Sequence, residues 1–293
     1  MPDAPPYRQV GIVGTGRVAR AMGLALADRS AGPLLLWGRH PAHCSAAIKA
    51  IGQGRCAPSL ADIATTCDLL VFAIADDAMD QRVEEMAAVD RADAPLVFHV
   101  SGRSGASTLA PLRAKGWLTA AIHPAMTFTG DPEEEIGRMI GARFAVTGSN
   151  DQARAAALAV VRRLGGAPME IVEEHRPLYH AALCHGANHL VTLIAGSFEA
   201  LSAAGVDDPA ALLGPLVRAA LENSLADGLA GLSGPLLRGD RETIIRHLAA
   251  LRQLCPALLP PYRAMAIATL DALERRGGTA SLSTCRSALE EDC

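Results

Sequence analysis

A short apolar run, a glycine-containing turn and a helical pattern follow one another without a break near the start of the chain. The run Val10–Val13 is rich in β-branched residues and precedes Gly14-Thr15-Gly16-Arg17-Val18-Ala19. A strand before and a helix after a G-x-G-x-x-[GA] pattern form the context in which this pattern binds a dinucleotide. Gly14 permits a tight turn, Gly16 keeps a Cβ away from the pyrophosphate, and Ala19 allows close packing of helix on strand. Free N–H groups at the helix start would then attract the phosphates. The residues predicted to hold the coenzyme here are Gly14, Thr15, Gly16, Arg17 and Val18.

The rest of the first half repeats this alternation of strand and helix. Apolar runs of strand length occupy residues 33–37, 68–75, 95–100, 117–122 and 139–147, with a shorter run at 55–57. This alternation predicts an α/β fold with a Rossmann doubly wound parallel sheet. Right-handed crossovers place the turns that follow the strands at one sheet edge, where they should line one crevice. These turns are residues 14–19, 38–40, 75–77, 101–105 and 123–127.

From residue 150 onwards, helical patterns dominate. They cover about 151–164, 176–204, 208–226, 240–253, 260–276 and 281–290, and residues 168–172 can form one more strand. We therefore expect two domains. Residues 1–150 form a Rossmann domain that binds a dinucleotide, and residues 151–293 form an all-helical C-terminal domain for substrate binding and dimerisation.

Charge and composition argue against several classes of partner. The 293-residue chain has a net charge of −4 and no cluster of basic residues, which argues against a nucleic-acid partner. Residues 177–198 lack Asp, Glu, Lys and Arg and are long enough to span a bilayer. His180, His185, Asn188 and His189 interrupt them, so we expect a buried helix and no membrane partner.

The chain start has no apolar signal segment and the seven cysteines are irregularly spaced, which predicts a cytoplasmic protein with reduced thiols.

The end of the second strand distinguishes between the two nicotinamide coenzymes. An acidic residue about 20 positions after the glycines would hold the ribose 2′-hydroxyl of NAD, but residues 36–40 read Leu-Trp-Gly-Arg-His. Arg39 can instead pair with the 2′-phosphate of NADP, a contact worth roughly 10- to 150-fold in coenzyme preference. The alternative is that Arg39 is an exposed surface side chain. We predict NADP, bound at this turn by Gly38 and Arg39.

Two neighbouring turns are expected to continue the coenzyme site. Ala75 and Asp76 follow the strand at 68–75, and Ser101 follows the strand at 95–100. Because these strands should lie side by side, the backbone and small side chains at both turns would pass over the ribose and nicotinamide. The alternative for Asp76 and Asp77 is helix capping, and Ser101 is equally compatible with a plain turn.

A histidine at a strand end is the first candidate for proton transfer. His123 follows the strand at 117–122 and begins the segment His-Pro-Ala-Met-Thr-Phe. At this edge it could bind a substrate carboxylate or relay a proton. The alternative is a structural histidine whose ring is tied to the backbone.

The uncharged helix at 177–198 supplies further candidates. At 100° per residue one half of the helix is apolar, and the other half carries His180, Cys184, His185, Asn188, His189 and Thr192. A polar face without Lys or Glu indicates burial against another domain, a coenzyme or a second subunit. His185 and His189 lack the adjacent glutamate and the third ligand of a zinc site, so we predict no metal.

A loop between helices offers a positive charge for substrate binding. Residues 231–240 include Arg238, whose guanidinium could clamp a substrate carboxylate. The alternative is a plain helix–helix connection, and Asp240 is in either case suited to cap the next helix.

These motifs together resemble a bacterial family of Rossmann-like oxidoreductases whose C-terminal helical domain is of unknown function. The resemblance rests on residues 10–19 (VGIVGTGRVA), residues 123–128 (HPAMTF), the helix from Tyr179 to Asn188 and residues 232–240 (LSGPLLRGD), and it covers nearly the whole chain. The family is similar in layout to pyrroline-5-carboxylate reductase, ketopantoate reductase and the β-hydroxyacid dehydrogenases. The resemblance implies NADP-linked hydride transfer on a small-molecule substrate and a homodimer built through the helical domain.

One position departs from the pattern of the related families. In the β-hydroxyacid dehydrogenases and ketopantoate reductases, a catalytic Lys precedes an Asn by four positions. Asn188 matches that Asn, but Cys184 occupies the Lys position. A general acid contributes about 10²–10⁴-fold to a rate, so the loss is substantial. Either His123, His180 or His185 takes the proton role, or the reaction needs little acid catalysis, as in imine reduction, or the protein has lost catalysis.

The sequence therefore predicts an NADP-dependent dehydrogenase or reductase that acts on a small oxo or hydroxy acid or on an imino acid. His123 and His185 are the candidate proton donors, Asn188 would orient the substrate, and Arg238 and Cys184 would contact it. The alternative is a non-catalytic NADP(H)-binding redox sensor or regulatory protein, which the missing Lys favours.

Overall fold

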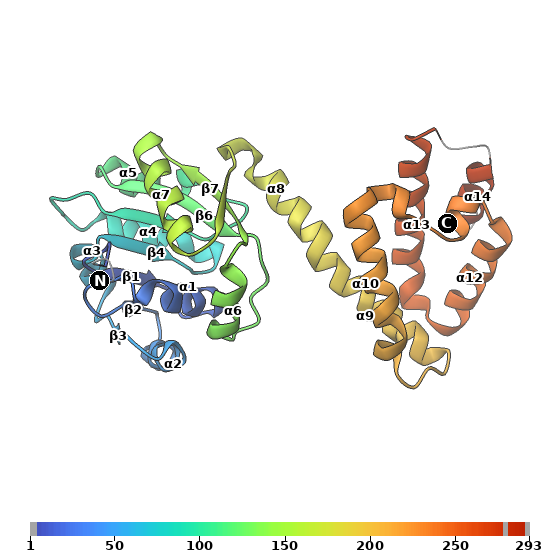
Figure 1. Ribbon diagram of the computed structural model, residues 1–293, viewed down its shortest axis with the longest axis horizontal. Helices are drawn as coiled ribbons and strands as arrows, with labels where there is room; N and C mark the ends of the chain where they lie inside the picture. Colours follow the sequence, from blue (N-terminus) through green and yellow to red (C-terminus); the bar gives the residue numbers. More distant parts are fainter. Residues whose placement is uncertain (1–4, 278–280, 291–293) are drawn as a thin grey trace. The chain divides into compact units, whose positions relative to one another are not determined.

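The computed structural model describes residues 5–277 and 281–290, and the chain divides into two compact units, each shown in Figure 1. The first unit spans Met1–Cys184 and the second spans His185–Cys293. The strands of the described chain all lie in the first unit, and the described part of the second unit is helical. The coenzyme-binding turns predicted from the sequence therefore belong to the first unit.

An eight-stranded sheet forms the centre of the first unit. Its strands are β1 (Val10–Val13), β2 (Leu35–Trp37), β3 (Arg55–Cys56), β4 (Leu69–Phe72), β5 (Leu96–His99), β6 (Leu118–Pro124), β7 (Arg143–Gly148) and β8 (Ala167–Glu170). Their spatial order is β3-β2-β1-β4-β5-β6-β7-β8. Neighbouring strands are parallel except β6 and β7, which run antiparallel. The Rossmann doubly wound sheet is confirmed, with the correction that its last two strands run opposite to the first six.

The strand order reverses beside β1. The chain passes from β1 outward to β2 and β3, and then returns to place β4 on the other side of β1. Loops after adjacent strands therefore leave in opposite directions at this point, which opens a crevice at the carboxyl ends of the strands. The glycine turn after β1 lies at this switch point, so the topology alone directs a ligand to it.

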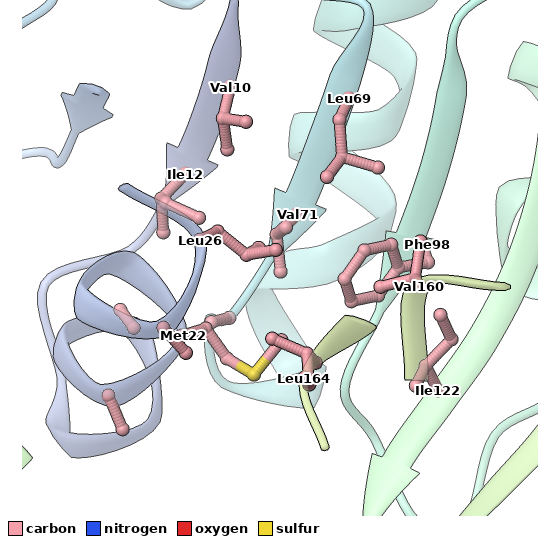
Figure 2. Packing of buried hydrophobic residues seen from close by; sticks show 14 of the residues in the cluster. Val10, Ile12, Met22, Leu26, Leu69, Val71, Phe98, Ile122, Val160 and Leu164 are labelled. Atoms are coloured by element: carbon pink, nitrogen blue, oxygen red, sulfur yellow. The ribbon is translucent and has the colours of Figure 1, made fainter. Parts of the chain in front are cut away.

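Helices cover both faces of the sheet (Figure 1). They are α1 (Arg17–Ala27), α2 (Pro41–Ile51), α3 (Leu60–Thr66), α4 (Met79–Ala87), α5 (Ala110–Ala114), α6 (Pro132–Met139) and α7 (Asp151–Arg163), with the 3₁₀ turns η1 (Asp76–Ala78) and η2 (Ala106–Leu109). Because strand residues alternate between faces, each strand feeds two cores. Ile12 and Val71 pack with Met22 of α1 and Leu164 after α7 (Figure 2). Phe72 belongs to the opposite core, which contains residues of α3, α4 and α5.

Side-chain caps fix several helix starts. Ser59 accepts a hydrogen bond from the amide of Asp62 at 3.1 Å and begins α3. Asp131 accepts from the amide of Glu133 at 3.0 Å and begins α6, a helix that the sequence patterns did not indicate. The first amides of a helix have no partner inside the helix, so these caps define where each helix begins.

Two cysteines are joined, which corrects the expectation that all thiols are reduced. Cys44 of α2 and Cys56 of β3 form a disulfide, and their Cα atoms are 6.1 Å apart. The free cysteines among the described residues are Cys67, Cys184, Cys255 and Cys285, and Cys293 lies outside the described residues. The pairing depends on how α2 packs beside β2 and β3, which irregular spacing along the chain does not reveal.

A π-helical segment interrupts the long helix expected at 176–204. A 3₁₀ turn, η3 (Glu173–His175), leads into α8 (Arg176–Leu183), the π segment η4 (Cys184–Asn188) and α9 (His189–Ala203). The turn of the π segment is wider because its hydrogen bonds run from i to i+5, and it shifts the helical register of every residue after it. The division of residues 177–198 into two faces at a uniform 100° per residue therefore does not hold across this segment.

The second unit has its own small core. Its further helices are α10 (Pro209–Asp227), α11 (Pro235–Arg238), α12 (Arg241–Leu254), α13 (Leu259–Glu274) and α14 (Ser281–Glu290), with the 3₁₀ turns η5 (Gly228–Gly231) and η6 (Pro256–Leu258). Ile244, Leu270 and Cys285 bury the contact between α12, α13 and α14. Asp240 accepts from the amide of Thr243 at 3.1 Å, so the predicted cap of α12 is confirmed.

The two compact units divide later in the chain than the boundary at 150/151 expected from the sequence. Residues 151–184 belong to the first unit because α7 packs in its core and β8 pairs with β7. A role of residues 151–293 in substrate binding and dimerisation stays a prediction. Within the described chain, none of the helices has both the length and the apolar character needed to cross a bilayer.

Candidate functional site

The turn after β1 is held tightly against two neighbouring strands. The N–H of Gly14 donates to the carbonyl oxygen of Trp37 at the end of β2, at 2.8 Å. The φ of Gly14 is +131°, a conformation that favours glycine. A Cβ on Gly14 would overlap the carbonyl oxygen of Ala73, just beyond β4. Glycine is therefore required here by the close approach of the backbone of β4.

The start of α1 is open for an anion. Gly16 is its N-cap residue, no side chain caps the helix, and its first turn contains no acidic residue. The first amides of a helix lack internal partners, and the helix dipole adds partial positive charge. A Cβ on Gly16 would meet no atom within 4 Å, so the space beside it is free of protein. The arrangement fits a coenzyme pyrophosphate.

A cleft of about 210 Å³ joins this turn to the ends of β2 and β4. Six residues predicted from the sequence line it: Gly14, Thr15, Gly16, Gly38, Arg39 and Ala75. None of the described residues that line the cleft is acidic. Arg39 is exposed and forms no ion pair with any residue that the structure describes. A cleft with basic and without acidic side chains suits a phosphorylated ligand.

The cleft also contains an arginine that the sequence analysis did not single out. Arg82 of α4 lines it, and its guanidinium carbon lies 5.7 Å from the ring centroid of Trp37. Arg82 also forms an ion pair with Glu85, one turn later in α4. No sequence pattern connects Arg82 with the glycine turn, because only the packing of α4 beside β2 brings them together.

The other predicted coenzyme residues lie outside this cleft. Arg17 extends toward the segment after β6, where its Nη1 donates to the carbonyl of Phe128 at 3.3 Å. Val18 packs against the core. Asp76 and Ser101 lie at the ends of β4 and β5, and the Ser101 hydroxyl donates to Asp76 at 3.2 Å. The expectation that these two turns meet is thus consistent with the structure, although neither residue lines the cleft.

Hydrogen bonds fix the loop after β5 at both ends. The Nε of Arg103 donates to Asp76 Oδ2 at 2.6 Å. At the start of the loop, the amide of Ser101 donates to His99 Nδ1 at 3.2 Å. His99 Nε2 lies 2.7 Å from the carbonyl oxygen of Gly105, which assigns the ring proton to Nε2. His99 is fully buried, and burial lowers its pKa to about 4, so the ring is neutral.

A fully buried arginine, Arg176, ties together the strands beside this loop. Its Nε donates to Thr147 Oγ1 at 2.9 Å, and its Nη groups donate to the carbonyls of Ser101, Ala121 and Ala145 at 3.1, 3.1 and 2.9 Å. No acidic side chain of the described chain lies within ion-pair distance of Arg176. Burial lowers the pKa of its guanidinium to about 10, so it stays charged at neutral pH. Carbonyl dipoles therefore balance this buried charge.

His123 meets two side chains of α8 at the end of β6. Its Nδ1 lies 2.9 Å from the hydroxyl of Tyr179, and its ring contacts that of His180 edge to face with centroids 5.9 Å apart. A Cβ on Gly102 would overlap the His180 ring, so glycine is needed where the loop after β5 passes these rings. Burial and the nearby charge of Arg176 lower the pKa of His123 to about 4, so its ring is neutral at pH 7.

The cleft and His123 lie at the same sheet edge, several strands apart. The ends of β2 and β6 are separated by four strand spacings in the sheet order, which corresponds to roughly 19 Å. An extended molecule with two nucleotides could reach from one to the other. The edge therefore offers phosphate-binding groups at one end and proton-bearing groups at the other.

The remaining predicted residues lie at or beyond the π segment. Cys184 Sγ lies 3.7 Å from His180 Nε2. In the second unit, His185 and His189 are exposed with their Nδ1 atoms 3.2 Å apart, and Asn188 is exposed. Arg238 is an exposed residue at the end of α11, and no hydrogen bond joins it to His185 or Asn188 in the described chain. The described residues contain no group of three or more side chains placed to hold a metal.

Comparison with known proteins assigns both halves of the chain. Residues 3–124 match the family model of a Rossmann-like domain, and residues 142–269 match a model described as Domain of unknown function (DUF2520). A search of the curated proteins finds no match.

Several solved structures share the fold. A protein from Bacteroides fragilis is 17% identical with a TM-score of 0.74, over 89% of this chain and 97% of its own. An imine reductase from Myxococcus stipitatus, in complex with NADP⁺, is 17% identical with a TM-score of 0.66, over 97% and 95%. A pyrroline-5-carboxylate reductase from Coxiella burnetii is 13% identical with a TM-score of 0.56, over 98% and 97%. At such identities the likeness shows the fold. The family models identify the chain as one in which a Rossmann-like domain is followed by a DUF2520 domain.

Proposed function

We propose that the chain is an NADP(H)-dependent oxidoreductase that reduces a small carbonyl or imine compound. The observation that carries the proposal is the cleft that is lined both by Gly16, the N-cap residue of the uncapped helix α1, and by Arg39. The imine reductase that shares the fold holds NADP⁺, which supports the same coenzyme here. Bound NADPH would supply a hydride, and the chain would supply binding groups and a proton.

The turn after β1 and its neighbours would hold the coenzyme. Gly14, Thr15 and Gly16 would approach the pyrophosphate, and Arg17 and Val18 would offer their backbone amides at the start of α1. At the end of β2, Gly38 leaves room for Thr15, because a Cβ there would meet the Thr15 methyl group.

Two further groups complete the proposed coenzyme contacts. Arg39 would pair with the 2′-phosphate, because it is exposed and free of any described ion-pair partner. Ala75 lines the cleft at the end of β4, and Asp76 and Ser101 lie at the ends of β4 and β5, which precede β6 and His123 in the strand order. The backbone and side chains of these residues would lie beside the ribose and the nicotinamide of the coenzyme.

His123 and Tyr179 would act together as the proton source. Among the described residues, His123 Nε2 has no hydrogen-bond partner, and Nδ1 is engaged by Tyr179 at 2.9 Å. A neutral His123 would carry its proton on Nε2 and accept the Tyr179 hydroxyl proton at Nδ1. His123 would give its Nε2 proton to the substrate oxygen or nitrogen while its Nδ1 takes the hydroxyl proton of Tyr179. Solvent would later return a proton to the Tyr179 oxygen. The nearby charge of Arg176 would stabilise the negative charge that develops on Tyr179.

The proposed substrate is a small oxo or imino acid. Arg176 has no carboxylate partner among the described residues, and its positive charge acts on Tyr179 and His123, which favours a substrate that carries a carboxylate. No lysine or carboxylate of the described chain bonds to His123, so a reaction with modest need for acid catalysis, such as imine reduction, is suited to this site. We propose that Asn188 orients the substrate, that His185 is the alternative proton donor, and that Arg238 and Cys184 contact the substrate.

We also propose that the chain forms a homodimer through its helical unit. Val191 on α9 and Leu212, Leu216 and Leu225 on α10 are more than half exposed. Monomeric proteins rarely leave such apolar residues uncovered on adjacent turns of a helix. Measurement of the molar mass in solution by light scattering tests this, and a mass near 30.5 kDa would contradict it.

The test of the proposed function is NADPH oxidation by the full chain with a panel of 2-oxo acids and cyclic imino acids. We expect turnover with one of the two classes, and loss of that turnover in His123→Ala but not in His247→Ala. Tight NADPH binding without turnover would favour the second candidate, a non-catalytic NADP(H) sensor, which the Cys184 side chain at the position of a catalytic Lys supports. Absence of NADPH binding would contradict both.

A further inference from the structure

We propose that Arg82 is a second specificity-determining cation for the 2′-phosphate of the coenzyme, that it acts together with Arg39, and that Glu85 limits its strength. The inference rests on the proposed coenzyme binding and adds to it a residue from a different element. Arg39 follows β2, whereas Arg82 lies in the second turn of α4. Both arginines line the same cleft.

Trp37 holds Arg82 at the wall of the cleft. The guanidinium carbon lies 5.7 Å from the centroid of the Trp37 ring, and only 17% of the Arg82 side chain is exposed. A cation over an aromatic face is attracted by the ring quadrupole, so this side chain is ordered before any ligand arrives. An ordered guanidinium loses less freedom on binding a phosphate than an extended surface arginine does.

Glu85 sets the charge that the cleft presents. Its carboxylate pairs with Arg82 Nη1, and its side chain is 42% exposed. A guanidinium has five N–H donors, so Arg82 can keep one contact with Glu85 and offer others to a phosphate. The carboxylate nevertheless repels a phosphate dianion that approaches the same group. Removal of its charge should therefore strengthen phosphate binding, and removal of the Arg82 charge should weaken it.

A purely structural role for Arg82 makes a different prediction. If Arg82 only stacks on Trp37 and pairs with Glu85, its loss would shift the end of β2 and weaken every adenosine ligand to the same degree. If Arg82 contacts the 2′-phosphate, its loss would weaken only ligands that carry this group. Adenosine 2′,5′-bisphosphate and adenosine 5′-monophosphate differ by the 2′-phosphate alone, so this pair of ligands separates the two roles.

The experiment is calorimetric titration of the full chain with these two compounds and with NADPH. We expect Arg82→Gln to weaken the bisphosphate about tenfold or more and to change the affinity for the monophosphate less than about twofold. We expect Glu85→Gln to strengthen the bisphosphate about two- to fivefold, with a steeper loss of affinity as salt is added. Arg82→Lys, which keeps the charge but not the planar group, should fall between Arg82→Gln and the unmodified chain.

Matched controls come from α6, where Arg138 and Glu134 form an exposed ion pair at 2.7 Å outside the cleft. Arg138→Gln and Glu134→Gln should change neither affinity. The inference is overturned if Arg82→Gln weakens both adenosine ligands equally, or if neither Arg82→Gln nor Glu85→Gln changes the affinities. In either case, NADPH binding by the unmodified chain leaves the proposed function standing. If Arg82→Gln does not fold, Glu85→Gln decides, and no gain for the bisphosphate overturns the inference. Absence of binding of all three ligands to the unmodified chain would overturn the proposed function as well.

Discussion

The Nδ1 atom of His123 and the hydroxyl of Tyr179 lie 2.9 Å apart and join the end of β6 to α8. Burial lowers the pKa of His123 to about 4 and raises that of Tyr179, so both groups are neutral at pH 7. A neutral pair can pass a proton along its hydrogen bond without placing a charged imidazolium beside Arg176. Under the proposed function, this pair would take the proton role of the lysine that the resembled families have at the position of Cys184.

Replacement of Tyr179 by Phe should lower the turnover number with little change in the affinity for NADPH. The hydroxyl would no longer supply a proton to His123, and a loss of about 10²-fold is expected for a missing acid. Tyr262→Phe is the matched control, because Tyr262 makes the same 2.9 Å contact to Nδ1 of His247 in the helical unit. Steady-state kinetics should show full activity in the control, and equal activity in both variants would contradict the proton role of Tyr179.

Replacement of the two glycines of the first turn by alanine should affect two different properties, the stability of the first unit and the affinity for NADPH. Gly14→Ala should destabilise the first unit, because the new methyl group would overlap the Ala73 carbonyl at a φ of +131°. Gly16→Ala should leave stability unchanged but weaken NADPH, because its methyl group enters space free of protein. Gly137→Ala, on α6 with no neighbour within 4 Å, serves as a control for both. Thermal unfolding and NADPH titration distinguish them, and unchanged NADPH affinity in Gly16→Ala would argue against a pyrophosphate at this turn.

Replacement of Arg176 by Met should destabilise the first unit by about 3–5 kcal/mol. The change removes four hydrogen bonds and leaves Thr147 and the carbonyls of Ser101, Ala121 and Ala145 without this donor. Arg176→Lys should recover little, because an ammonium group cannot reach the same set of acceptors. Urea unfolding followed by tryptophan fluorescence measures this, since Trp37 and Trp117 both lie in the first unit. A loss no larger than that of the surface variant Arg138→Met would contradict the account.

Stability of the first unit should fall as the pH is lowered from about 6.5 to about 4. Burial lowers the pKa of His99 from 6.5 to about 4, so in this range the unfolded chain binds more protons than the folded chain. The stabilisation is complete above pH 6.5 and is lost as the pH approaches 4. His99→Gln, which can still donate to the Gly105 carbonyl, should lose about 2 kcal/mol less between pH 7.5 and pH 5 than the unmodified chain. An equal loss in the two proteins would show that His99 does not carry the effect.

The parts of the fold that depend on residues adjacent in the chain could be predicted from the sequence. The Gly14–Gly16 turn and the caps at Ser59 and Asp240 are each determined by a few adjacent residues, and the structure contains them. The strand runs could be read because buried parallel strands are continuously apolar. The reversal of β7 could not, because an apolar run does not encode its direction.

Parts of the candidate site depend on contacts between distant segments. Arg82 joins the cleft only through the packing of α4, and Arg176 appears in the sequence as an ordinary charge before an uncharged helix. The Cys44–Cys56 pair depends on the packing of α2. His99 was detectable in principle, since a histidine that ends the apolar run of β5 must find buried partners. Helical periodicity places Tyr179 on the apolar half of residues 177–198 and does not show that its hydroxyl meets His123.

The most direct test of the account is titration of the full chain and of Arg39→Ala with NADPH and NADH. We predict that the unmodified chain binds NADPH at least about tenfold more tightly than NADH, and that Arg39→Ala weakens NADPH by a similar factor while it leaves NADH nearly unchanged. Binding of neither coenzyme, or equal weakening of both in Arg39→Ala, would contradict the proposed site.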